Sequence, residues 1–200
     1  MFRDFSKLRD WSVSRLARNH ERKKRVRKQI PADVEVTVAN NTDGMFEYQS
    51  PNKVLTLSME KYGDEEFVNF EDLRQLKRYL EDFSLVIVDV NSDEYSVIDI
   101  ARSLRVNRSY EEYFKSILGL SDEEMEEEYD IDLEELDDFI KDSTLEEYKV
   151  QLEGRIKKTI IERSVALYRE GELNDYSKLQ ALKATRPVDE RETFLDYVKG

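Results

Sequence analysis

Few residues in this sequence have the types and spacing that catalysis requires. The single histidine, His20, lies among basic residues, and no serine and carboxylate are spaced to complete a hydrolytic triad with it. One histidine also cannot supply the two or three imidazole ligands of a typical zinc site. The six glycines are widely separated, so neither a phosphate loop nor a dinucleotide fingerprint is present. We therefore expect a protein that is not an enzyme and that needs no cofactor.

One short loop has oxygen side chains in a spacing that could hold calcium. Asp89, Asn91 and Asp93 occupy positions 1, 3 and 5 of an EF-hand pattern. However, Glu94 stands where the loop requires glycine, and Ile100 stands where a glutamate should close the site. We expect the end of a strand followed by a helix cap here, and no metal site.

Carboxylates crowd residues 122 to 138, and paired carboxylates could hold two hard cations for phosphodiester chemistry. Most of them occupy adjacent positions, such as Glu126 and Glu127, which point to different sides of a helix and do not converge. The segment is therefore interpreted as a solvated acidic face.

Charge is divided sharply along the chain, although the net value is −13. Residues 1–30 hold eleven lysines and arginines against three acids, a charge of +8, and residues 120–153 hold sixteen acids against two lysines, a charge of −14. The candidate interaction residues of the basic arm are Arg15, Arg18, Arg22, Lys23, Lys24, Arg25, Arg27 and Lys28. Those of the acidic face are Asp122, Glu123, Glu126, Glu127, Asp130, Glu134, Asp137 and Asp138.

The composition indicates a folded protein of a reducing compartment. Hydrophobic residues make up 39% of the 200 residues and charged residues 38%, which allows one good core. Cysteine is absent, so disulfides and thiolate chemistry are excluded. The longest apolar run, from Leu85 to Val88, is far too short to span a membrane, and the sequence begins without a signal peptide. We expect a cytoplasmic protein with no membrane contact.

The hydrophobic pattern predicts an α+β fold with three regions. These are a basic N-terminal helix or arm over residues 1–30, an α+β core over 31–106, and a helical region over 107–200 with an acidic stretch at 121–147. The core, at about 33–105, should hold a small antiparallel sheet with packed helices, and the C-terminal half should be all helical.

Alternating and helical spacing place the elements of the core. Strands are predicted at 34–38, 45–49 and 54–57, joined as a three-stranded meander, and another at 85–88. A helix capped by Asn69 should run from Phe70 to about Asp82, and a second from about Tyr95 to Arg105.

Beyond residue 105 the pattern predicts several helices. Three serine and glutamate pairs fit the capping box that begins a helix: Ser109 with Glu112, Ser121 with Glu124, and Ser143 with Glu146. The longest helix is predicted from about Thr144 to Glu170, with Gly171 ending it. Shorter helices should follow at 176–184 and 189–198.

Three functions fit these observations. The first is a non-enzymatic protein-interaction module, an adaptor, assembly or regulatory factor, and the small cysteine-free core with charged helices would suit a viral or mobile-element accessory protein. In the second, the arm at 15–28 binds nucleic-acid phosphates. In the third, the acidic face occupies a basic groove on a partner, as a nucleic-acid mimic or inhibitor would. The partner that we expect is a protein, and nucleic acid stays open through the arm.

Overall fold

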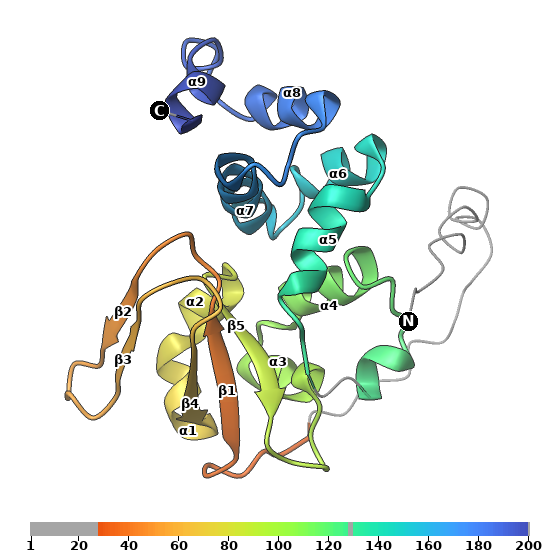
Figure 1. Ribbon diagram of the computed structural model, residues 1–200. Coiled ribbons are helices and arrows are strands. Elements are labelled where there is room, and N and C mark those ends of the chain that lie inside the picture. The colour runs from red at the N-terminus through yellow and green to blue at the C-terminus, as the bar shows by residue number, and fades with distance from the viewer. Residues whose placement is uncertain (1–27, 128–129, 200) are drawn as a thin grey trace.

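The computed structural model describes residues 28–127 and 130–199, and they form an α+β fold, as predicted. The strands are β1 (Glu35–Asn40), β2 (Phe46–Gln49), β3 (Thr56–Met59), β4 (Glu65–Asn69) and β5 (Leu85–Val90). The helices are α1 (Phe70–Leu73), α2 (Lys77–Glu81), α3 (Val97–Leu104), α4 (Asn107–Ser116), α5 (Glu134–Asp142), α6 (Leu145–Gln151), α7 (Lys157–Glu170), α8 (Tyr176–Ala184) and α9 (Phe194–Lys199), with 3-10 turns η2 (Arg74–Leu76) and η3 (Glu124–Glu127). In Figure 1 the strands occupy the lower part of the molecule, and α5 to α9 stack above them.

β1 is the centre of an antiparallel three-stranded sheet with the order β4-β1-β5. Val36 lies opposite Val68 of β4 and Val90 of β5, and the register with β5 shifts between Thr37 and Val38. Every residue of β1 after the first is buried. Because side chains of a strand alternate between the two faces of a sheet, both faces of β1 are covered.

The predicted meander is wrong, although its strands exist. β2 and β3 pair with each other in a separate two-stranded sheet, with Phe46 opposite Met59, and β4 takes the place beside β1. Asn40, the last residue of β1, binds the backbone of two later loops, and no hairpin to β2 is formed. The Asn40 side-chain nitrogen donates to the carbonyl oxygens of Gly44 and Lys61, at 2.6 and 3.0 Å. These bonds fix the point where the chain leaves one sheet for the other.

The helical segment after β4 forms largely where its spacing predicted. Phe70, Leu73, Leu76 and Leu80 are all buried, which confirms the predicted apolar face. The turn η2 separates α1 from α2, so the segment is not one continuous helix. Asn69 stands directly before α1, but its side chain makes no capping bond. The predicted buried strand at 85–88 and the predicted helix at 95–105 are also present, as β5 and α3.

The single helix predicted from Thr144 to Glu170 is wrong, because residues 152–156 separate α6 from α7. Gly154 lies in this break, and a Cβ atom there would collide with the carboxylate of Glu112. That carboxylate accepts a hydrogen bond from the backbone nitrogen of Arg155, at 2.7 Å. Gly171 ends α7 in a left-handed conformation, as predicted.

Of the three predicted capping boxes, one is confirmed. The backbone nitrogen of Ser121 donates to the Glu124 carboxylate at 2.8 Å, and the Glu124 nitrogen donates to the serine hydroxyl at 3.3 Å. The second box forms one residue later than predicted, between Thr144 and Glu147. The third is wrong, because Ser109 lies inside α4, where its hydroxyl donates to the last carbonyl oxygen of α2, at 2.8 Å.

A buried lysine joins α8 to the rest of the helical half. Lys178 is only 2% exposed, and its Nζ atom donates to the carbonyl oxygens of Ile140 and Lys141 at 2.9 and 2.8 Å. These carbonyl groups belong to the last turn of α5, where a helix leaves its acceptors unsatisfied. The ring of Tyr148 lies 5.8 Å from the same nitrogen. Burial lowers the pKa of Lys178 below its usual value.

Candidate anion-binding groove

Most of the predicted basic arm, including His20, lies outside the described residues. Of its eight candidate residues, Lys28 alone is described. Its Nζ atom lies 2.5 Å from the Asp99 carboxylate and donates to the carbonyl oxygen of Glu94 at 2.9 Å. Asp99 is buried in α3, whereas the Lys28 side chain is 49% exposed. The chain is thus attached to the start of α3 at the point where the described residues begin.

Two of the predicted acidic-face residues are held in internal ion pairs. The Glu126 carboxylate accepts two hydrogen bonds from the guanidinium of Arg102, at 2.5 and 2.7 Å. The Asp137 carboxylate does the same for Arg163, at 2.6 and 2.7 Å, and Arg163 lies 4.1 Å from the ring centre of Tyr62. The hydrogen bond to Glu126 raises the pKa of Arg102. Both carboxylates therefore fasten the acidic segment to the fold.

The remaining acidic-face residues lie at the surface. Asp122 pairs with Lys115 at 2.7 Å, and Asp138 pairs with Lys141 at 3.4 Å, both in exposed or partly exposed positions. The other four are exposed and have no ion pair among residues 28–127 and 130–199; they are Glu123, Glu127, Asp130 and Glu134. The acidic face is thus divided between carboxylates that hold ion pairs and carboxylates that have none within the described residues.

The loop with EF-hand-like spacing, at residues 89–93, begins at the end of β5. Asp89 lies within β5 and forms a bridge with Asp130, and the Asn91 side chain donates to the Glu35 carboxylate at 3.3 Å. The part of the chain that the structure describes contains no cluster of three metal-ligating side chains. In the same part, no helix is both long and apolar enough to cross a membrane.

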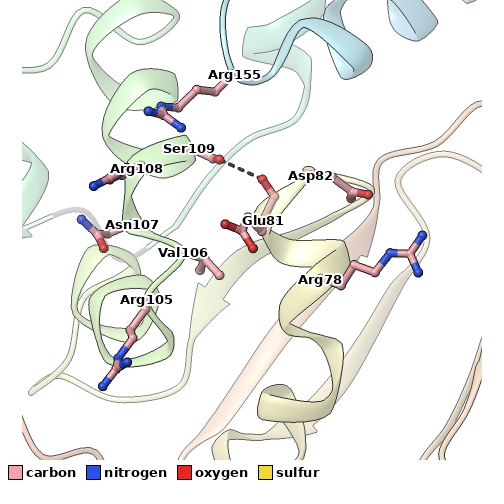
Figure 2. Close-up of a pocket in the computed structure, with 9 residues that line it drawn as sticks. All are labelled: Arg78, Glu81, Asp82, Arg105, Val106, Asn107, Arg108, Ser109 and Arg155. Atoms are coloured by element: carbon pink, nitrogen blue, oxygen red, sulfur yellow. Dashed lines mark hydrogen bonds between the residues drawn. The ribbon is translucent and has the colours of Figure 1, made fainter.

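A groove lies where the end of α2, the corner between α3 and α4, and the break between α6 and α7 meet. It encloses about 840 Å³ and is lined by Arg78, Glu81, Asp82, Arg105, Val106, Asn107, Arg108, Ser109 and Arg155. In Figure 2, Arg105, Arg108 and Arg155 extend on the α3 and α4 side, and the side chain of Glu81 faces them from α2. Arg78 points to the opposite side of α2. The corner between α3 and α4 and the break between α6 and α7, which are distant in sequence, thus place three guanidinium groups beside one hollow.

The groove has an excess of positive charge in an acidic protein. Four arginines and two acids line it, which gives a formal charge of four minus two, or +2. Within the described residues, none of the four guanidinium groups makes an ion pair or a side-chain hydrogen bond. Arg102 and Arg163, by contrast, each hold a carboxylate with two bonds. A guanidinium carries five hydrogen-bond donors in a planar fork that matches a carboxylate or phosphate.

The backbone adds to this positive potential. α4 begins at Asn107, and Arg108 stands in its first turn, where no acidic residue is present. The free amide groups of a helix start carry a partial positive charge that normally favours Asp or Glu there. Arg105 ends α3 in the left-handed conformation, with φ 64°, a position where glycine is usual. This tight corner brings Arg105 and Arg108 to the same edge of the groove.

No protein-family model, curated protein or solved structure matches this chain. Function is therefore inferred from the groove itself. Among the described residues, its lining contains arginine, carboxylate, amide and hydroxyl groups and no histidine, cysteine or lysine. Arginine stays protonated at any physiological pH, so it binds anions well and transfers protons poorly. The chemistry that the groove offers is recognition of an anionic group.

The sequence pattern did not indicate this site. Its arginines stand at positions 78, 105, 108 and 155, outside both charge blocks. One local signal existed, because the segment Arg105-Val106-Asn107-Arg108 places two arginines at a helix boundary and no acid in the first turn after it. Convergence with Arg155 depends on how the helical half packs on the core.

Proposed function

We propose that the protein is a non-enzymatic protein-interaction module that binds an acidic segment of a partner in the arginine-lined groove. One observation carries this proposal: the guanidinium groups of Arg105, Arg108 and Arg155 lie beside a hollow of about 840 Å³ and make no ion pair within the described residues. Elsewhere in the fold, Arg102 within α3 and Arg163 within α7 are each paired with a carboxylate. The groove thus offers donors that a second molecule can use.

The chemistry of the groove favours an acidic peptide over an apolar one. Val106 is the single apolar residue that lines it in the part of the chain that the structure describes, so burial of apolar surface can contribute little. Bidentate bonds from arginine to carboxylate are short and directional, and they give specificity as well as affinity. The net charge of −13 repels an acidic partner at long range. At physiological salt this repulsion is screened beyond about 8 Å, whereas contacts inside the groove persist.

The test measures binding of a short fluorescent glutamate-rich peptide to the full chain by fluorescence anisotropy at ~0.15 M salt. We expect saturable binding that weakens roughly 10-fold when Arg105, Arg108 and Arg155 are all replaced by glutamine, because three charged contacts are lost. The matched control replaces three exposed lysines outside the groove by glutamine, namely Lys53, Lys61 and Lys149. It removes the same charge and should bind as the wild type does.

A nucleic-acid duplex serves as the competing probe in the same assay. Arginine also binds phosphate, and the basic arm is a second possible contact for a duplex. Alanine at Lys23, Lys24, Arg25 and Arg27 removes the charge of the arm without touching the groove. Strong duplex binding that these alanines abolish, together with no binding of the acidic peptide, would contradict the proposal and favour a nucleic-acid function.

A further inference from the structure

The chain itself carries an acidic surface that could enter such a groove. Glu123 immediately precedes η3, Glu127 ends it, and Glu134 begins α5. With Asp130, these residues are exposed and make no ion pair within the described parts of the chain. Within the described residues, these four unpaired carboxylates are thus complementary in charge to the three unpaired guanidinium groups beside the groove, those of Arg105, Arg108 and Arg155.

Hydrogen bonds tie the neighbours of these acidic residues to the core. Glu126, in the same turn as Glu127, is tied to α3 by its two bonds with Arg102. The Ile131 backbone nitrogen donates to the Val88 carbonyl oxygen of β5 at 2.7 Å, next to Asp130. Less conformational entropy is lost when a surface that is already ordered meets a partner.

The two surfaces of one molecule do not meet. Among the described residues, no ion pair or hydrogen bond joins a carboxylate of the acidic surface to an arginine of the groove. The groove lies at α2 and the start of α4, whereas the acidic surface lies at η3 and the start of α5. A contact between them therefore requires a second molecule.

We infer that copies of this chain associate head to tail, with the acidic surface of one copy in the arginine-lined groove of the next. This inference rests on the proposed function of the groove and names its partner. The two surfaces differ, so the contact is heterologous: repetition of it gives a ring if the rotation closes and an open chain if it does not.

The net charge makes the salt dependence of this association distinctive. Each copy carries −13, so long-range repulsion opposes association at low salt. At ~0.15 M salt the repulsion is screened, and at ~1 M the contacts in the groove are screened as well. Self-association should therefore be strongest at intermediate salt. An apolar interface would instead persist or strengthen at high salt.

The experiment uses sedimentation velocity of the full chain with two variants. The groove variant has glutamine at Arg105, Arg108 and Arg155, and the acidic-surface variant has glutamine at Glu123, Glu127 and Glu134. Wild type should assemble at ~0.15 M salt, and each variant alone should associate roughly 10-fold more weakly. An equimolar mixture should form dimers only, because each variant supplies one intact half of one contact. Glutamine at Lys53, Lys61 and Lys149 should leave assembly unchanged, and thermal unfolding checks that every variant is folded.

The outcomes separate this inference from the proposed function. If wild type stays monomeric at every salt concentration but binds the glutamate-rich peptide through the groove, the self-association is refuted and the proposed function stands. If wild type and the groove variant assemble equally, the head-to-tail contact is refuted. If wild type neither assembles nor binds the peptide, both proposals fall. A mixture of the two variants that yields no dimer also overturns the inference.

Discussion

Replacing Lys178 by methionine tests how α8 is held to the helical half. Methionine keeps the length and apolar character of the lysine stem but lacks the ammonium group. The change therefore removes the two hydrogen bonds that Nζ donates to Ile140 and Lys141, at 2.9 and 2.8 Å, without opening a large cavity. The two carbonyl groups, at the end of α5, are left without a donor.

The magnitude follows from opposing contributions. A hydrogen bond that involves a charged group contributes about 1.5 to 3 kcal/mol, and an unsatisfied buried carbonyl costs about 1 to 3 kcal/mol. Burial of the ammonium group, which also lowers the pKa of Lys178, offsets part of this stabilisation. We expect a net loss of about 2 kcal/mol in the free energy of unfolding. For a chain of 200 residues this corresponds to a fall in Tm of ~4 to 8 °C.

Urea unfolding followed by circular dichroism measures this loss, with Lys183→Met in the same helix as the control. The pH dependence gives a second, independent test. The folded pKa of Lys178 lies below its unfolded value, so the unfolded state binds more protons between the two values. Relative to the variant, wild type should therefore gain stability as pH rises toward ~10.4. A loss below ~0.5 kcal/mol, or a pH trend of the opposite sign, would refute this account of Lys178.

Three further predictions concern other parts of the fold. Asp137→Asn should lower the free energy of unfolding by about 2 kcal/mol, since it leaves the largely buried Arg163 guanidinium with the more distant Glu170 carboxylate, at 3.7 Å, in place of its two bonds to Asp137; urea unfolding measures it, and an unchanged midpoint would contradict it. Gly154→Ala should cost about 1 kcal/mol, because the new methyl group displaces the Glu112 carboxylate from its backbone bond; in a Glu112→Gln background the cost should shrink. Burial raises the pKa of Tyr148 to about 12, so stability should fall as pH passes ~10, where exposed tyrosines of the unfolded chain ionise. Tyr148→Phe should make that fall less steep in alkaline unfolding curves.

Several elements could be predicted because local pattern determines them. The spacing of Leu73, Leu76 and Leu80 marked the face of the helical segment that packs inward. Gly171 marked the end of α7, and α8 spans the predicted residues 176–184. In each case the signal lies within one turn of the element that it describes.

The pairing of strands could not be predicted in the same way. β4 has the sequence EEFVN, and Val68 is its single buried residue, so it shows no alternation that would mark a strand. Its conformation depends on pairing with β1, which the sequence pattern does not encode locally. The meander was predicted because neighbouring strands often pair, whereas here Asn40 directs the chain to another sheet.

The groove and the internal ion pairs depend on packing between distant segments. Glu126 and Asp137 looked like free acids in the sequence, but their arginine partners lie 24 and 26 residues away. Arg155 reaches the groove because Gly154 interrupts a helix that its neighbours would otherwise continue. The charge pattern along the chain therefore showed where acidic and basic side chains are concentrated. It did not indicate which of these side chains form internal ion pairs and which remain available at the surface.

The left-handed backbone of Arg105 lowers the stability of the fold, while its side chain contributes to the groove. Its left-handed conformation, φ 64°, costs a non-glycine residue about 1 kcal/mol that glycine would not incur. A glycine at this corner would strengthen the fold and at the same time remove one guanidinium from the groove. Selection for thermal resistance alone would favour glycine at this position. Variants selected for stability are therefore expected to lose Arg105 before the other arginines of the groove. Arginine would be retained at this position only under selection for binding.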